Sequence, residues 1–140
     1  MVDTSVLLDL ATLDPRWAEW SVAALRAASA GGAPLLADPV VYAELSVRFA
    51  APAELDRFLS DAGVVVVPTP PAALFLAARA HLACRRRGGP RPGVLPDFFV
   101  GAHAAVSGLP LVTRDPSRAR TDFPDLRLIS PGVGDGPPPT

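Results

Sequence analysis

The chain has 140 residues and a mass of 14.6 kDa; 49% of its residues are hydrophobic, 19% are charged, and its formal net charge is −1 at pH 7. This length suits one domain, the composition is too apolar for a disordered chain, and no apolar run reaches the roughly 18 residues of a membrane span. The single cysteine, Cys84, excludes an internal disulfide framework. All 13 basic residues are arginine, which excludes the phosphate-binding P-loop, because its motif needs a lysine. We therefore expect one soluble, cytoplasmic domain that does not contact membranes.

The first half of the chain alternates short strand-like runs with longer helical ones. A glycine pair, Gly31 and Gly32, ends the first long helical run, and Asp38 with Pro39 has the chemistry of a helix N-cap and first position. The predicted elements of this half are a strand at residues 1–5, helices at 6–10 and 16–30, a strand at 35–37, and helices at 39–50 and 52–61.

The second half continues the alternation. Four consecutive valines, residues 64–67, predict a strand covered on both faces. The elements predicted after it are a helix at 71–87, a loop at 88–96, a helix at 96–107, a strand at 109–113, a helix at 116–121 and a strand at 126–129. The apolar face of the helix at 71–87 is expected to consist of Leu74, Ala77, Ala78, His81 and Leu82. Strands that alternate with helices predict an α/β fold with a parallel sheet and helices on both faces.

Three acidic residues stand where a predicted strand ends or the next helix begins. Asp3 follows Val2 at the first junction between strand and helix, Asp115 follows the strand at 109–113, and Asp97 lies in the first turn of the helix at 96–107. Each also has a purely structural interpretation, because a carboxylate there caps a helix or complements its dipole. A fourth acid, Glu44, stands within an apolar helical stripe, where it either pairs with Arg48 one turn later or shares a cation.

These four acids are expected to converge. Asp3 and Asp115 fall at the carboxyl ends of parallel strands, where ligands of such folds bind, and Asp97 and Glu44 lie on helices beside that edge. Four neighbouring carboxylates repel one another unless they are protonated or bridged by a cation. Ligation by oxygen alone selects Mg²⁺ or Mn²⁺, which can position or activate water against a phosphodiester.

The helix at 96–107 is apolar on nearly all sides, so we expect it to be buried with Asp97 pointing toward the end of the sheet. Gly101, one turn after Asp97 on the same face, permits another backbone to approach closely. The two histidines, His81 and His103, are interpreted as hydrogen-bonded structural residues, with ligand roles not expected.

Charge is divided unevenly along the chain. Residues 1–70 carry nine acidic residues and four arginines, whereas residues 71–140 carry five acidic residues and nine arginines. The second half includes a cluster made of Arg85, Arg86, Arg87 and Arg91. This cluster is either an edge that contacts phosphates or a solvated helix end whose cations offset the helix dipole. Further candidate phosphate contacts are Arg114, Arg118 and Arg120.

Three strings of sequence match a known pattern in order and separation. They are Val2-Asp3-Thr4-Ser5-Val6-Leu7-Leu8-Asp9, LPDFFVGAHA from Leu95 to Ala104, and Thr113-Arg114-Asp115. With these strings the chain resembles the PIN-domain endoribonucleases, and among them the VapC-type toxins of bacterial toxin–antitoxin pairs. The segment at residues 123–131 is similar to the last strand of that family, so the resemblance covers residues 1–131.

The resemblance implies a three-layer α/β/α fold whose parallel sheet has the strand order 3-2-1-4-5. It implies a PIN domain at residues 1–131, and the proline-rich end predicts a flexible tail at 132–140. It also implies a Mg²⁺ site, in which Mn²⁺ can substitute, formed by the four acids with supporting hydroxyls on Ser5 and Thr113. Asp3 and Asp97 are the two acids most directly tied to the metal.

The implied activity is hydrolysis of RNA phosphodiester bonds by a homodimeric toxin. The implied partner is a VapB-type antitoxin, whose C-terminal segment can insert an arginine into the acidic pocket. Two alternatives stay open: a catalytically degraded PIN-like module that binds RNA or protein, and a nuclease that acts on DNA. All four acids being present favours a nuclease over the degraded module, and the short chain leaves little room for additional DNA-gripping elements.

Overall fold

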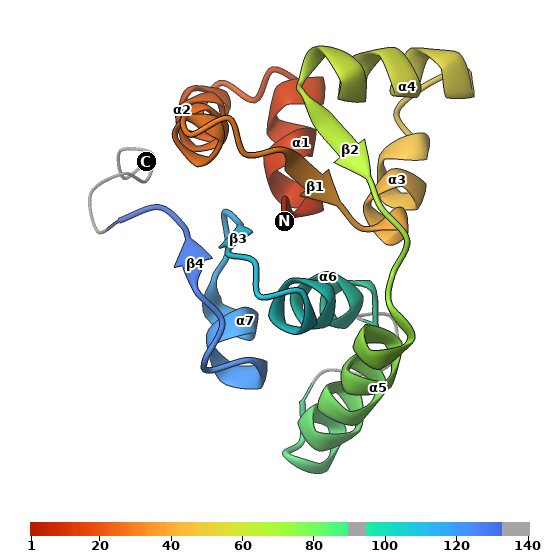
Figure 1. Cartoon of the computed structure of the whole chain (residues 1–140), viewed down its shortest axis with the longest axis vertical. Coiled ribbons are helices and arrows are strands. Elements are labelled where there is room, and N and C mark those ends of the chain that lie inside the picture. Colours follow the sequence, from red (N-terminus) through yellow and green to blue (C-terminus); the bar gives the residue numbers. More distant parts are fainter. Residues whose placement is uncertain (90–94, 133–140) are drawn as a thin grey trace.

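The computed structural model describes residues 1–89 and 95–132, and in this part of the chain seven helices are interspersed with four short strands (Figure 1). The strands are β1 (Leu35–Ala37), β2 (Val64–Val66), β3 (Leu111–Val112) and β4 (Leu128–Ile129). The helices are α1 (Thr4–Ala11), α2 (Ala18–Ser29), α3 (Pro39–Ser46), α4 (Pro52–Asp61), α5 (Pro71–Arg86), α6 (Leu95–Val106) and α7 (Ser117–Asp122).

The start of α3 follows from its local sequence. Oδ1 of Asp38 accepts a 2.8 Å hydrogen bond from the backbone N–H of Val40, and Pro39 occupies the first position of the helix. The helix ends at Ser46, four residues before the predicted end at residue 50. The amide of Ala50 is instead bonded to the side chain of Glu54 at 3.1 Å, which directs the chain into α4.

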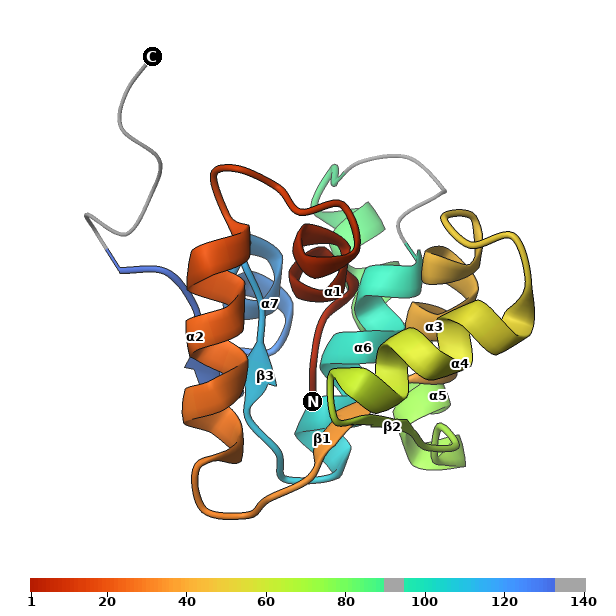
Figure 2. The same cartoon turned by 90° about the horizontal axis from the view of Figure 1, so that it is seen from above.

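The strands pair in two parallel sets. β1 pairs with β2 and β3 pairs with β4, and the N-terminal segment lies between β1 and β3 (Figure 2). The amide of Val2 donates to the carbonyl of Leu36 at 2.8 Å, and the amide of Asp3 donates to the carbonyl of Val112 at 2.9 Å.

The strand predicted at residues 1–5 is reduced to a single bridge between Val2 and Val112, because α1 already begins at Thr4. The described strands form two separate two-stranded sheets. The continuous five-stranded order 3-2-1-4-5 therefore stays a prediction. The strands lie between α1, α2 and α4 on one side and α5 and α6 on the other (Figure 1).

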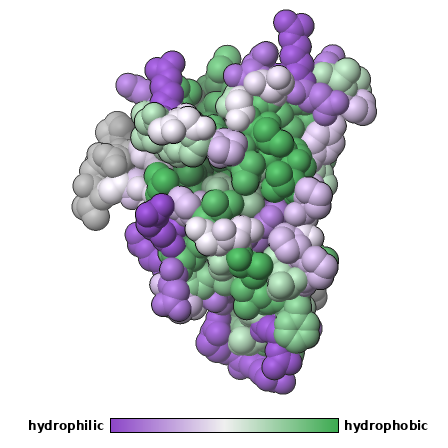
Figure 3. Space-filling model, viewed as in Figure 1, coloured by the Kyte–Doolittle hydropathy of each residue, from purple (hydrophilic) through white to green (hydrophobic). Residues whose placement is uncertain are grey.

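One prediction about buried faces is wrong, for β2, and another is only partly right, for α5, where Ala77 of the predicted face is buried. β2 is an edge strand and is not covered on both faces, because the residue Val65 is 54% exposed. In α5, Leu74 and Leu82 are exposed, and the buried positions are Ala73 and Ala77, which pack with α6. Small residues at the contact let the two helices approach closely, so the larger side chains of α5 face outward. Hydrophobic surface is visible over β2 and α5 (Figure 3).

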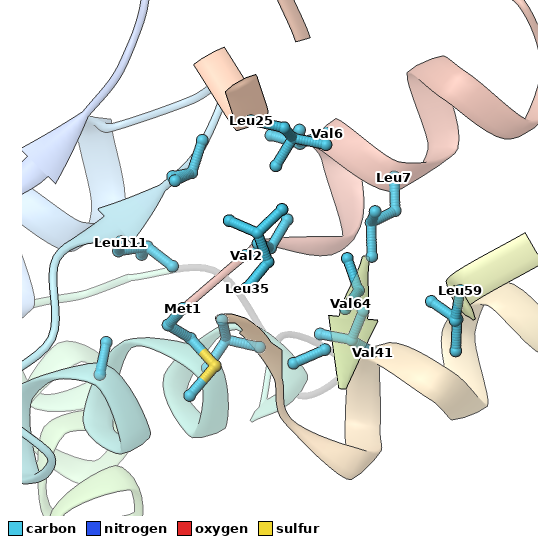
Figure 4. Packing of buried hydrophobic residues seen from close by; sticks show 14 of the residues in the cluster. Met1, Val2, Val6, Leu7, Leu25, Leu35, Val41, Leu59, Val64 and Leu111 are labelled. Carbon is cyan, nitrogen blue, oxygen red and sulfur yellow. The ribbon is translucent and has the colours of Figure 1, made fainter. Parts of the chain in front are cut away.

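The main hydrophobic core joins the strands to the surrounding helices. Val2, Leu7 and Val41 are fully buried in it, beside Leu35 and Val64 from the first strand pair (Figure 4). Burial of each such aliphatic side chain contributes about 1.5–3 kcal/mol. This core fixes the N-terminal segment, and hence Asp3, at the centre of the fold.

A second buried cluster fixes α6. Gly101 of α6 faces Phe123, and a Cβ atom at Gly101 would lie 2.5 Å from the Phe123 ring. A close neighbour at Gly101 is thus confirmed, but it is the side chain of Phe123 and not the backbone that the sequence analysis expected.

A buried polar contact also holds α6. Nδ1 of His103 lies 2.7 Å from Oδ2 of Asp38, and the hydroxyl of Thr69 donates to the same oxygen at 2.6 Å. This confirms the structural interpretation of His103. The corresponding prediction for His81 is wrong: its Nε2 is buried without a hydrogen-bond partner among the residues described, and its ring packs edge-on against Phe98.

Two predicted features fall wholly or partly outside the described residues. Of the predicted loop at 88–96, residues 90–94 lie outside, and so does Arg91. Of the predicted tail at 132–140, residues 133–140 lie outside as well. Within the described ranges, no helix has the length and hydrophobicity needed to cross a membrane.

Candidate active site

Asp3 stands at the junction between the N-terminal segment and α1, where it is the N-cap of the helix. Its Oδ1 accepts a 2.9 Å hydrogen bond from the amide of Thr4. Its Oδ2 accepts hydrogen bonds from the hydroxyls of Ser5 at 2.9 Å and Thr113 at 2.7 Å. Both hydroxyls that the sequence assigned a supporting role therefore contact the same carboxylate oxygen.

Glu44 projects from α3 toward the start of α1. Its Oε2 accepts a hydrogen bond from the hydroxyl of Thr4, and the described residues include no ion pair between Glu44 and Arg48. Burial raises the pKa of Glu44 above its ordinary value, and the charges of Asp97 and Asp3 raise it further, whereas the Thr4 hydrogen bond lowers it. The structure thus brings Glu44 to the other acids and away from its local partner.

Asp97 lies in the first turn of α6. Nη1 of Arg118, from α7, donates a 2.7 Å hydrogen bond to Oδ2 of Asp97. Burial raises the pKa of Asp97, the Arg118 guanidinium lowers it, and the charges of Asp3 and Asp115 raise it. Asp97 therefore interacts electrostatically with all three of the other predicted site acids, Asp3, Glu44 and Asp115.

Asp115 follows β3 and precedes α7. Its Oδ1 accepts hydrogen bonds from the hydroxyl of Ser117 at 2.6 Å and from the amide of Ser117 at 3.0 Å. These hydrogen bonds hold the pKa of Asp115 below its ordinary value. The carboxylate is therefore ionised and fixed at the start of the helix.

All four acids line one cleft of about 360 Å³. Two hydroxyl residues that the sequence analysis did not assign to the site, Thr4 and Ser117, also line it. Each lies within two positions of a site acid, which is the one sequence feature that could have indicated them. The remaining polar residues of the cleft are Ser5, Thr113, Arg114 and Arg118.

The cleft suits a hard divalent cation in its chemistry, since its acidic donors are all carboxylate oxygens. The spacing of these carboxylates does not yet suit such an ion. In residues 1–89 and 95–132, no three acidic, histidine or cysteine side chains are placed closely enough to hold one ion. Asp97 is instead held by Arg118. The residues thus fit the ion by type, and their side chains must close together to bind it.

A model of the PIN domain matches residues 1–124 of the chain. The chain belongs to the PIN-domain family. No curated protein is similar enough in sequence to match it.

Solved structures show the same fold. The chain is similar to one from a crystal structure of VapBC2 from Rickettsia felis bound to a promoter DNA fragment, with a TM-score of 0.69 and 16% identity. It is similar to a chain from DNA-bound VapBC of Salmonella typhimurium, with a TM-score of 0.65 and 17% identity. A chain from VapBC-1 of nontypeable Haemophilus influenzae gives a TM-score of 0.66 and 16% identity. Each comparison covers 93% of this chain and 96% of the other chain.

The arginines of this PIN domain have different environments. Arg114 donates to Asp9 at 2.5 Å and lies over the Trp17 ring, 5.5 Å from its centre. Arg87 pairs with Asp122, whose side chain is 3% exposed. Both guanidinium groups are therefore bound to carboxylates outside the four-acid set.

Three more of the candidate phosphate contacts are exposed: Arg85, Arg86 and Arg120. Arg85 and Arg86 lie in the last turn of α5. In residues 1–89 and 95–132 neither arginine forms an ion pair. As cations at a helix end, they fit the dipole interpretation and can also contact an anionic ligand.

Proposed function

We propose that this PIN domain is a Mg²⁺-dependent endoribonuclease and the toxin component of a VapBC-type pair. The observation that carries the proposal is the single cleft lined by four acids from separate parts of the chain, Asp3, Glu44, Asp97 and Asp115. Membership of the PIN family and the likeness to chains from VapBC complexes support it.

In this proposal Asp3 and Asp97 are the principal ligands, and Glu44 and Asp115 complete the set. The bound ion would stabilise the charge that develops on the phosphodiester during hydrolysis. Ser5 and Thr113 orient the carboxylate of Asp3 through their hydrogen bonds. Hydrolysis would leave a 3′-hydroxyl and a 5′-phosphate. Mn²⁺ would substitute for Mg²⁺, because it shares the preference for oxygen ligands.

The proposed partners follow from the acidic character of the cleft. A VapB-type antitoxin that inserts an arginine would satisfy the carboxylates with charge-assisted hydrogen bonds and exclude the ion. RNA phosphates would contact the exposed arginines of α5, Arg85 and Arg86. We further propose that the toxin acts as a homodimer in the cytoplasm.

The test is cleavage of RNA by Asp3→Asn and Asp97→Asn in the presence of Mg²⁺. Each substitution keeps the size of the side chain and removes one negative oxygen, so we expect the rate to fall by at least about a hundredfold. Asp61→Asn, on the exposed surface of α4, is the matched control and should cleave like the wild type. Wild-type cleavage by Asp3→Asn or Asp97→Asn would contradict the proposal.

The alternative is a PIN-like binding module with a degraded site. The separation of the acids in the described structure favours it, because no three of them are placed to share an ion. Titration with Mn²⁺ distinguishes the two functions: an active site that binds the ion raises the melting temperature, by an amount that grows with ion concentration. A degraded site would show no shift.

A further inference from the structure

Among the residues that the structure describes, Asp97 and Phe98 both contact Arg118 in the acidic cleft. Its Nη1 donates to Oδ2 of Asp97 at 2.7 Å, and its guanidinium carbon lies 5.7 Å from the centre of the Phe98 ring. Cation–ring attraction and a charge-assisted hydrogen bond therefore hold one guanidinium against two successive residues of α6. The side chain of Arg118 is 31% exposed and that of Asp97 is 52% exposed, so solvent reaches both partners.

The pairing places a positive charge on one of the proposed metal ligands. Nη1 of Arg118 lies 2.7 Å from Oδ2 of Asp97, and Asp3 and Asp115 line the same cleft. Arg114, which lines the same cleft, has a different role, because its guanidinium is bound to Asp9. Arg118 thus stands where a divalent ion would neutralise Asp97.

Arg118 also borders a second cleft. This space of about 370 Å³ shares Ser117 and Arg118 with the acidic cleft and is lined further by Arg87 and Thr121. A guanidinium that leaves Asp97 has this adjoining space to enter. There it would lie beside the ion pair of Arg87 and Asp122, which also line this space, so its own positive charge would be the one left to attract an RNA phosphate.

We infer that Arg118 is an internal counter-cation that pairs with Asp97 in the metal-free protein, is displaced when a divalent ion binds, and then contacts an RNA phosphate. The inference rests on the proposed function, since it assumes that the cleft binds a metal ion and RNA. It gives one side chain opposite effects on the two ligands: Arg118 competes with the metal and assists the RNA.

The experiment measures Mn²⁺ affinity by calorimetry in RNA-free protein. Arg118→Met keeps the length and the apolar contact with Phe98 and removes the charge, so we expect Mn²⁺ to bind about fivefold more tightly than to the wild type. Arg118→Lys retains a cation and should stay closer to the wild type than Arg118→Met does. Arg120→Met removes an exposed charge from the same helix and controls for long-range electrostatics; we expect it to change affinity less than about twofold.

The second measurement is the KM for RNA at saturating Mg²⁺. Loss of one phosphate contact should raise the KM of Arg118→Met by about threefold or more. If Mn²⁺ binds Arg118→Met no more tightly than the wild type, the competition is overturned. If the metal binds more tightly and the KM is unchanged, the contact with RNA is overturned.

The proposed function fails separately from this inference. If the wild type binds no Mn²⁺ and cleaves no RNA, both are overturned. If the wild type binds Mn²⁺ and Asp97→Asn abolishes cleavage, yet Arg118→Met leaves both constants unchanged, the proposed function stands and the role of Arg118 is overturned. Melting of each variant without metal establishes that it is folded.

Discussion

The hydroxyl of Thr113 donates a 2.7 Å hydrogen bond to Oδ2 of Asp3, although 110 positions separate the two residues in the sequence. Thr113 is 1% exposed, so water does not compete for this contact. The bond connects the end of β3 to the start of α1 and fixes the orientation of the carboxylate. The same hydrogen bond therefore contributes to the fold and orients a proposed metal ligand.

Replacement of Thr113 should weaken metal binding without removing a ligand. Thr113→Val keeps the branched shape and loses the hydroxyl, so we expect Mn²⁺ affinity to fall about tenfold, as for other groups that orient a ligand. Calorimetry at neutral pH measures the change. Thr113→Ser, which keeps the hydroxyl, should retain most of the affinity. Equal affinity in Thr113→Val and the wild type would show that this hydrogen bond does not orient the ligand.

Glu44 should make the metal-free protein less stable at neutral pH than at acidic pH. Burial raises the pKa of Glu44 in the folded state, so between about pH 4.5 and the raised value the folded state holds a proton that the unfolded chain has lost. The contribution of Glu44 to the free energy of unfolding therefore decreases as pH rises through this window. Glu44→Gln has no charge to bury and should be more stable than the wild type at pH 7 without metal.

Urea unfolding at pH 7 and at pH 4, with a chelator present, measures this difference. The advantage of Glu44→Gln should shrink at pH 4, where the wild-type side chain is largely protonated in both states. Glu19→Gln, an exposed site on α2, reports the general effect of removing one negative charge. The prediction is wrong if Glu44→Gln and the wild type unfold with the same pH dependence.

Gly101 should tolerate no side chain. A Cβ atom there would lie 2.5 and 2.7 Å from two ring carbons of Phe123, which also lines the acidic cleft. We expect Gly101→Ala to lower the free energy of unfolding by about 1–3 kcal/mol, the usual cost of overpacking. Gly31→Ala, where nothing lies within 4 Å, should change it by less than about 0.5 kcal/mol. Similar results for the two variants would show that the Phe123 ring moves aside without cost.

Two arginines at the end of α5, Arg85 in its last turn and Arg87 directly after it, should differ in the property that their replacement changes. Arg87 pairs with the buried side chain of Asp122, so Arg87→Met should lower the free energy of unfolding by about 1–2 kcal/mol. Arg85→Met removes an exposed charge and should instead reduce the salt dependence of RNA binding, by about 0.7 in the slope of log K against log salt. Urea unfolding and RNA titration at several salt concentrations measure the two effects. The prediction is contradicted if Arg85→Met lowers the free energy of unfolding and Arg87→Met changes only the salt dependence of RNA binding.

Local sequence signals were sufficient for several elements. The strand at residues 35–37 and the helix at 52–61 have the predicted bounds, and Asp38 caps α3 as expected. Gly108, with a φ of 64°, follows the end of α6 and the short turn after it. Each of these features depends on a side chain or a backbone conformation within a few residues, so the local sequence is sufficient to predict it.

The pairing of charged side chains was not accessible in this way. Arg118 is 21 positions from Asp97, Arg87 is 35 from Asp122, and Arg114 is 105 from Asp9. From the sequence all three arginines were equivalent candidates for phosphate contacts. Their different environments follow from the packing of α7, α5 and β3 against other elements, which no local pattern describes.

The residue pattern by itself predicted carboxylates at strand ends and helix starts, with arginines as the basic residues, because caps, turns and apolar periodicity depend on neighbouring residues. The supporting hydroxyls of Ser5 and Thr113 were implied only by the resemblance to the PIN-domain family. Only the tertiary structure decided that Glu44 contacts Thr4 rather than Arg48, and that Arg118 occupies the cleft beside Asp97. Both contacts depend on the packing of side chains that are distant in the sequence. Burial of the hydrophobic core fixes the relative positions of the helices and strands, and these positions determine which polar side chains come within hydrogen-bond distance.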